Sequence, residues 1–210
     1  MTAPQKPVID HDEAAVLAAR AAGVRRLVKL SAISASEPGS WHHRSEQPTR
    51  DSGLGWTVLR PGSFASNLLH YAPMIKNGDP VPNWTSAGAI GVIDPRDVAA
   101  VATEVLTSAD HTGQEYVLTG PQLLTFDQQI AVLNEVLGKE IRTQHVALDA
   151  AHHMMLRDGT APETAKESVA GMAGLAEGRY AFLTDEVPKI LGRPATSFAA
   201  WVHAHQEAFH

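Results

Sequence analysis

Gly23-Val-Arg-Arg-Leu-Val-Lys-Leu-Ser-Ala-Ile-Ser-Ala35 is the stretch that decides the fold of this chain. It predicts a short buried strand over 26–30, which follows a helix that ends at Gly23 and leads at Ser31 into a loop of small residues. A second unit repeats this order, with a glycine at 53, an apolar run over 55–59 and then Arg60-Pro-Gly-Ser63. Because helices and strands alternate at this spacing, we predict an α/β fold with a parallel sheet flanked by helices.

The carboxyl ends of these two strands are the expected place for a site. In open parallel sheets, ligands bind beyond the carboxyl ends of the strands. Residues 31–35 follow the first strand, and residues 60–64 follow the second. We therefore expect functional side chains in both segments.

Capping patterns mark further helix starts. Asp10, Asp94, Thr125 and Thr160 are each followed three residues later by an acidic residue or a glutamine, which is the pattern of a capping box. Short strands are predicted at 90–93, 115–119 and 141–146, a short helix near 45–51 and an irregular loop over 77–86. The pattern is mostly helical from 149 onward. A soft boundary near Leu137 divides the chain into a sheet-based part, 1–137, and a small, mainly helical lobe, 138–210.

Composition and charge exclude several classes of protein. The absence of cysteine excludes disulfides and thiolate metal sites, and a formal net charge of -6 without a basic cluster argues against direct nucleic-acid binding. No run approaches the roughly 18 apolar residues of a membrane helix. The first residues have no apolar core like that of a secretory signal. We therefore expect a cytoplasmic protein with no membrane or nucleic-acid partner.

Three segments and the tail carry a family resemblance. Residues 21–32, 52–64 and 94–99 read Ala-Ala-Gly-Val-Arg-Arg-Leu-Val-Lys-Leu-Ser-Ala, Ser-Gly-Leu-Gly-Trp-Thr-Val-Leu-Arg-Pro-Gly-Ser-Phe and Asp-Pro-Arg-Asp-Val-Ala. With Leu-Gly-Arg-Pro and Phe-Ala-Ala-Trp-Val in the tail, they resemble the NmrA-like branch of the atypical short-chain dehydrogenases/reductases. The resemblance implies a Rossmann domain that binds NAD(P), a small carboxyl-terminal lobe and a substrate cleft between them. The family includes quinone and azo-dye reductases, redox-sensing regulators that bind protein partners, and enzymes of secondary metabolism.

The sequence departs from this family at its amino-terminal end. The family's glycine-rich turn, which surrounds a pyrophosphate with backbone N–H groups, is not present in these 210 residues. NAD(P) is thus the cofactor that the resemblance implies, on a truncated Rossmann-like sheet. Two explanations stay open: a short member that has lost its dinucleotide half, or an artefact of where the sequence starts. The start at Met1 favours the first.

Truncation of the sheet has a consequence for assembly. In the family's strand order, the strand at 26–30 would neighbour a strand of the missing half. Here it becomes a sheet edge that carries the apolar residues Leu27, Val28 and Leu30. Because exposed apolar edges favour strand pairing, we expect the amino-terminal segment or a second copy of the chain to cover this edge, and we predict a homodimer.

Ser31, Pro61, Gly62 and Phe64 are the candidate cofactor-binding residues. Ser31 matches the family's catalytic serine, although a serine at a strand end also bonds the local backbone. Pro61 and Gly62, with Phe64 behind them, match the family's turn beside the nicotinamide, and a plain turn is an equally good interpretation. The family's usual Tyr-x-x-x-Lys pair would fall near positions 38 and 42 and is not present, so its proton chemistry is not supported.

Two adjacent histidines are further catalytic candidates. His42 or His43 could act as a general base, because imidazole titrates near neutral pH and this segment adjoins the expected cleft. His42 and Glu46 would also share one face of a helix. A metal site needs a third ligand, and the spacing is generic, so no metal site is predicted.

Four aromatic residues could line a pocket for a flat aromatic ligand. These candidate substrate residues are Trp41, Phe64, Tyr71 and Trp84, together with Asn67. Packing in the core and loops explains the aromatic residues at least as well. The aromatic ligand class therefore stays one of two interpretations.

The leading functional hypothesis is a reductase that uses NAD(P)H on a quinone-like or aromatic small molecule. The second is a ligand-sensing or regulatory module that does not bind dinucleotide and acts through a partner or through dimerisation. The third is a cofactor-independent cyclase or proton-transfer enzyme that acts on an aromatic metabolite with His42 or His43 as base.

Overall fold

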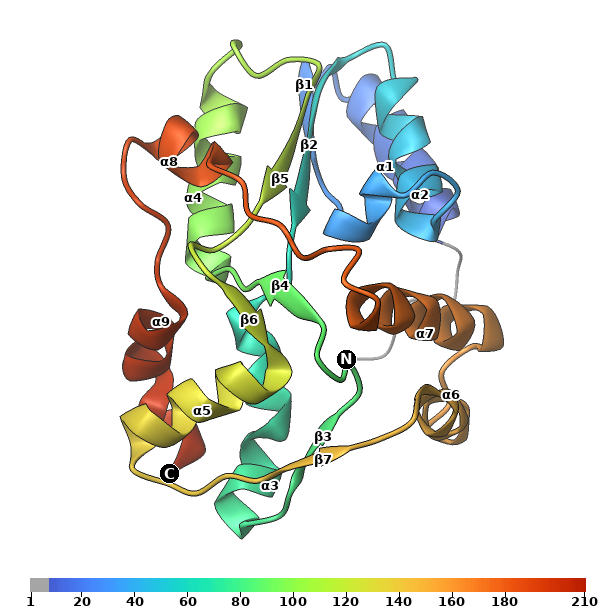
Figure 1. Ribbon diagram of the computed structural model, residues 1–210. Helices are drawn as coiled ribbons and strands as arrows, with labels where there is room; N and C mark the ends of the chain where they lie inside the picture. Colours follow the sequence, from blue (N-terminus) through green and yellow to red (C-terminus); the bar gives the residue numbers. More distant parts are fainter. Residues whose placement is uncertain (1–7) are drawn as a thin grey trace.

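A parallel sheet of three strands organises the first half of the computed structural model, which describes residues 8–210 (Figure 1). The strands β1 (Arg26–Leu30), β2 (Gly55–Pro61) and β5 (Gln114–Leu118) lie in the order β1-β2-β5. Arg26 pairs with Gly55 and Leu30 with Leu59, in parallel register. The prediction that the first two strands are parallel neighbours is therefore confirmed.

Helices cover both faces of this sheet. α1 (Val8–Ala21) packs on α2 (Trp41–Arg50), and α2 contacts β1 and β2 on one face. α4 (Pro95–Thr107) contacts the same strands on the other face (Figure 1). β2 lies between these layers, and its residues 57–61 are all buried. In the neighbouring strands β1 and β5, most residues are partly or fully exposed. The predicted α/β fold, a parallel sheet flanked by helices, is confirmed.

The outer edge of β1 is open within the part of the chain that the structure describes. β1 pairs with β2 on one side and with no other strand in that range. The side chain of Leu30 is 56% exposed. The predicted sheet edge is present, and what covers it stays a prediction.

Short elements follow the sheet. η1 (Ile33–Ser36) joins β1 to α2, whereas η2 (Ala65–Tyr71) and α3 (Ala72–Asn77) lead from β2 to two small strand pairs. In these pairs β3 (Val81–Asn83) is parallel to β7 (Thr143–His145), and β4 (Ala89–Gly91) is antiparallel to β6 (Leu123–Thr125). The expected irregular loop over 77–86 thus contains a strand, because β3 finds a partner far along the chain.

Most of the remaining helices pack against earlier elements of the chain. After α5 (Phe126–Leu137) come α6 (Leu148–Arg157), α7 (Pro162–Ala176), α8 (Glu186–Leu191), α9 (Phe198–His205) and η3 (Gln206–Phe209). α8 contacts α4, and α9 contacts α5. One apolar cluster joins Trp201 and Phe209 to Leu68 and Leu133, and another joins Val187 to Leu59. The division near Leu137 stays a prediction.

Helix starts correct several sequence expectations. Asp94 and Thr125 cap α4 and α5 as predicted. Asp10 instead lies inside the first turn of α1, and α7 begins after Ala161 without a side-chain cap, so neither predicted box forms there. Asp97 does not complete a box either. Its Oδ2 accepts a hydrogen bond of 2.6 Å from the backbone N–H of Thr196, because the carboxyl-terminal segment folds back onto α4.

α2 is longer than the short helix expected near 45–51. It begins at Trp41 because the Ser40 hydroxyl oxygen accepts a hydrogen bond of 3.2 Å from the backbone N–H of His43. The extra turn places residues 41–43 on a helix. None of the helices in the range 8–210 has both the length and the apolar character that crossing a bilayer requires.

Candidate functional site

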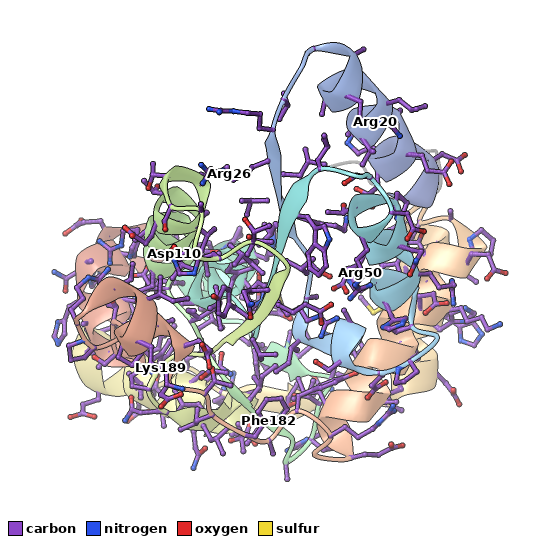
Figure 2. All side chains as sticks on the ribbon, turned by 90° about the horizontal axis from the view of Figure 1, so that it is seen from above. Arg20, Arg26, Arg50, Asp110, Phe182 and Lys189 are labelled. Carbon is purple, nitrogen blue, oxygen red and sulfur yellow. The ribbon has the colours of Figure 1, made fainter. Side chains whose placement is uncertain are left out.

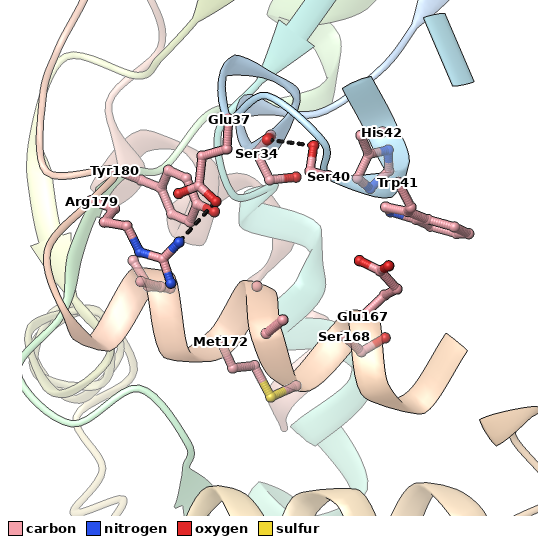
Figure 3. Close-up of a pocket in the computed structure, with 13 residues that line it drawn as sticks. Ser34, Glu37, Ser40, Trp41, His42, Glu167, Ser168, Met172, Arg179 and Tyr180 are labelled. Carbon is pink, nitrogen blue, oxygen red and sulfur yellow. Dashed lines mark hydrogen bonds and ion pairs between the residues drawn. The ribbon is translucent and has the colours of Figure 1, made fainter. Parts of the chain in front are cut away.

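A cavity of about 410 Å³, called cavity 1 below, lies beside the segment that follows β1 (Figure 3). Residues 34–42, from η1 to the start of α2, form one wall, and α7 with the segment after it forms the other. Its polar lining comes from both walls and includes Ser34, Glu37, Ser40, His42, Glu167 and Arg179. A cavity therefore lies beside the segment where a site is predicted, but part of its wall comes from α7 and the segment after it.

Two ion pairs connect the walls of cavity 1. The guanidinium of Arg179 lies 2.8 Å from a carboxylate oxygen of Glu37, as Figure 3 shows. Arg44 reaches Glu167 of α7 at 3.4 Å. Both pairs are partly exposed, so they fix the position of α7 more than they add to stability.

His42 faces cavity 1, whereas His43 does not line it. The His42 ring lies edge-on to Trp41, with ring centroids 4.8 Å apart. Burial, with the nearby Lys29 ammonium, lowers the pKa of His42, so its imidazole is neutral at pH 7. His43 instead places Nδ1 3.0 Å from the carbonyl oxygen of Ala35, which requires a proton on that nitrogen.

Ser31 lies buried at the end of β1. It is only 7% exposed, and its backbone N–H donates to the Leu59 carbonyl at 2.7 Å. Its Oγ makes no hydrogen bond of regular geometry among residues 8–210, although the hydroxyl lies close enough to the Glu46 carboxylate to help lower the pKa of Glu46. The alternative interpretation, in which this hydroxyl bonds the local backbone, is therefore not what the structure shows. A buried hydroxyl without a regular hydrogen bond fits a ligand that would supply one.

A buried ion network fixes α2 against the sheet. Glu46 is fully buried and accepts hydrogen bonds from Arg60 at 3.0 and 2.7 Å and from Arg50 at 2.6 Å. Both arginines also pair with Glu115 of β5. Seen from above, Arg50 lies between α2 and the strands (Figure 2). Burial alone would raise the pKa of Glu46, but the bonds from Arg60, the nearby Ser31 hydroxyl and the charges of Arg60 and Arg50 hold it below its usual value.

This network orients the histidine that faces cavity 1. His42 and Glu46 are four residues apart on α2, so they occupy the same face of the helix, as the sequence predicts. Fixing Glu46 against Arg60 therefore also fixes how deeply this face of α2 sits against the sheet. The sequence indicates the shared face, but not that Arg60, at a strand end, is the partner of Glu46.

A second cavity of about 290 Å³, called cavity 2 below, has an aromatic wall. Tyr71 and Trp84 line it together with Phe126, and the rings of Tyr71 and Phe126 meet edge to face at 5.6 Å. Asn67 also lines cavity 2. Burial raises the pKa of Tyr71. Three of the five candidate substrate residues thus meet at one cavity.

The other candidates lie elsewhere. Trp41 lines cavity 1, and Phe64 packs against the apolar cluster around Leu59. Pro61 is buried at the end of β2. A Cβ on Gly62 would lie 2.4 Å from the carbonyl oxygen of Gly91, so the missing side chain of Gly62 admits the backbone of β4.

Several lining residues carry no sequence signal for a site. Met172 and Leu175 of α7 line both cavities, and Arg179 and Tyr180 close cavity 1 at one end. Burial, with the Glu37 carboxylate close by, raises the pKa of Tyr180 to about 12. Met172 and Leu175 belong to a helix rich in alanine and glycine, Arg179 and Tyr180 follow it, and only the tertiary fold brings them to the strand ends. In the described range 8–210, no three metal-ligating side chains are arranged to hold an ion.

Comparison with known proteins identifies relatives of this chain. The sequence model of a family described as NAD(P)H-binding matches residues 4–109. A (4-alkanoyl-5-oxo-2,5-dihydrofuran-3-yl)methyl phosphate reductase of Streptomyces griseus is 37% identical over 97% of this chain and 74% of its own length. An NAD(P)H azoreductase of Xenophilus azovorans is 36% identical over 93% of this chain and 70% of its own length.

A solved structure agrees with these relatives. The crystal structure of an NADPH-dependent quinone oxidoreductase from Escherichia coli superposes with a TM-score of 0.79 and 26% identity. It covers 94% of this chain, and this chain covers 73% of it. The likeness therefore includes the helical elements after residue 137 as well as the sheet.

Proposed function

Because the chain belongs to the NAD(P)H-binding family of atypical, NmrA-like short-chain dehydrogenases/reductases, we propose that it reduces a quinone-like or other small aromatic substrate with NAD(P)H. The observation that carries the proposal is the pair of cavities beyond the strand ends. One contains the neutral His42, and the other is walled by Tyr71, Trp84 and Phe126. Such aromatic walls suit a flat ring.

Substrates of the relatives support this class of ligand. The names of two relatives give an azo compound and a quinone as substrate, in an azoreductase and in a quinone oxidoreductase of Escherichia coli. Quinones are flat, conjugated molecules, and azo dyes join such rings. Cavity 2 offers the kind of surface on which they pack.

For the cofactor, the residues present fit only the nicotinamide end. The buried Ser31 hydroxyl makes no hydrogen bond of regular geometry and suits a polar group such as a carboxamide, and Pro61 and Phe64 lie at the neighbouring strand end. We include Gly62 in this proposed set as a backbone position only, since its side-chain space is taken. A glycine-rich pyrophosphate turn is not part of these 210 residues. When bound, NAD(P)H supplies a hydride. His42, which faces cavity 1, would hold or transfer the accompanying proton.

Calorimetric titration with NADPH and NADH tests this proposal. We expect heat from at least one cofactor, and oxidation of that cofactor when a quinone is added. Ser31→Ala should weaken cofactor binding by about 3- to 10-fold, the loss of one hydrogen bond. Ser36→Ala, on the exposed side of η1, is the matched control and should change nothing. No heat at millimolar concentrations of either cofactor would remove the reductase assignment.

A second candidate function is proton transfer without a cofactor. It is favoured by the lowered pKa of His42 inside cavity 1. If no cofactor binds, loss of turnover in His42→Ala, with His43→Ala active, would support this alternative. Binding of an aromatic ligand without any turnover would instead support a ligand-sensing module.

We also propose that a second copy of the chain covers the outer edge of β1. The apolar Leu30 is exposed at this edge, and no strand of the described range pairs there. Sedimentation equilibrium should give a dimer, and Leu30→Lys should dissociate it because a charge at an edge strand opposes pairing. Leu17→Lys on exposed α1 is the control. A monomer at high concentration contradicts the proposal.

A further inference from the structure

Cavities 1 and 2 are neighbours that share one wall. Among residues 8–210, two line both of them, Met172 and Leu175, which are three residues apart on the same face of α7. Cavity 1 has charged lining groups beside Trp41 and Tyr180, whereas the described lining of cavity 2 has no Asp, Glu, Lys or Arg and is aromatic on one wall. The separation between a polar chamber and an aromatic one therefore depends on these two side chains.

Leu175 is the fixed part of this wall. Its side chain packs against the larger apolar cluster of the molecule. Its carbonyl oxygen lies against Gly88, where an added Cβ would be 2.2 Å away. Moving Leu175 would thus disturb both the core and a close backbone contact.

Met172 is the part that can move. It is not among the residues packed against either apolar cluster. Its neighbours Gly171 and Ala173 have little or no side chain, and a Cβ at Gly171 would meet nothing within 4 Å. An unbranched thioether with three rotatable bonds changes rotamer easily.

We propose that Met172 is a gate between the two cavities and determines whether the site accepts a one-ring or a two-ring ligand. This inference rests on the proposed function for the choice of aromatic ligands. Each cavity alone, at about 410 and 290 Å³, has the volume of a site for one small molecule. An elongated ligand whose polar ring lies in cavity 1 and whose apolar ring lies against Tyr71 and Trp84 must displace Met172.

Calorimetry without cofactor tests the gate with two probes, hydroquinone and the two-ring 4-phenylazophenol. In Met172→Ala, we expect the Kd of 4-phenylazophenol to fall by about 3- to 10-fold, because no side chain has to move, while that of hydroquinone changes less than about twofold. In Met172→Phe, a larger and stiffer side chain should raise the Kd of the two-ring probe by about 10-fold or more and leave hydroquinone within about twofold. Met154→Ala is the control, since this exposed methionine of α6 lines neither cavity.

The outcomes separate the gate from the proposed function. Equal changes for the two probes, no change in either variant, or no binding of the two-ring probe to the unaltered chain would each overturn the gate. Because cofactor is left out, a failed NADPH titration does not affect this result. If the chain reduces quinones with NADPH but the Met172 variants change the Kd of both probes equally, the proposed function stands and the gate is refuted.

Discussion

Replacing Arg60 with methionine isolates the energetics of the buried ion network. The network holds two cations, Arg50 and Arg60, and two anions, Glu46 and Glu115. Arg60→Met leaves one cation for two carboxylates. Glu46 is fully buried and loses both of its bonds from Arg60, at 3.0 and 2.7 Å. Removing one partner of a buried pair costs about 3–5 kcal/mol.

The remaining contact of Glu46 sets the expected value within this range. Arg50 still contacts Glu46 at 2.6 Å, so the carboxylate keeps one charged partner. The loss should therefore lie near the lower end, at about 3 kcal/mol. This is a large part of the roughly 5–15 kcal/mol by which a domain of this kind is stable.

Urea unfolding at pH 7 measures the loss. The double variant Glu46→Met with Arg60→Met leaves Arg50 and Glu115 as a neutral pair, and should recover most of the lost stability. Arg44→Met is the matched control, because its 3.4 Å pair with Glu167 is partly exposed and is worth about 0–1 kcal/mol. A loss below about 1 kcal/mol in Arg60→Met would refute the reasoning. So would a double variant whose unfolding free energy is lower than that of both Arg60→Met and Glu46→Met.

The same variant has a defined dependence on pH. The folded pKa of Glu46 lies below its ordinary value of 4.5, so the network stabilises the fold fully above that pH. This stabilisation is lost as the pH falls below 4.5 toward the folded pKa. The stability difference between the unaltered chain and Arg60→Met should therefore shrink over this acidic range.

Three further predictions concern single positions. Because burial lowers the pKa of His42 from 6.5, kcat/KM should fall on the acidic side of pH 6.5, and this limb should be absent in His42→Ala. Gly120→Ala should destabilise the fold by several kcal/mol or prevent folding, since its Cβ would overlap the backbone carbonyl of Val92. Gly171→Ala, at an open helical position, should instead raise the unfolding free energy by about 0.5–1 kcal/mol. Ser40→Ala removes the cap of α2 and should cost about 1 kcal/mol in urea unfolding.

Local sequence patterns determined the sheet and several helix ends. The apolar runs at 26–30 and 55–59, each preceded by a polar segment and a glycine, sufficed to predict parallel neighbours. Asp94 and Thr125 marked helix starts correctly, because a cap is a contact between residues two or three positions apart. The strand ends also indicated where cavity 1 would lie.

Only the tertiary structure decided what completes the site. Patterns at Asp10 and Thr160 look like caps, yet neither forms one, since the same short motif is compatible with other positions in a helix. The pairing of Glu46 with Arg60, and the presence of Met172 and Trp84 in the lining of one cavity, depend on contacts between distant elements. Periodicity and capping reflect contacts within a few residues, so the sequence indicates only the side of the candidate site at the strand ends. A cavity wall depends on how whole helices pack, so the other side, formed by α7, follows from the tertiary structure alone.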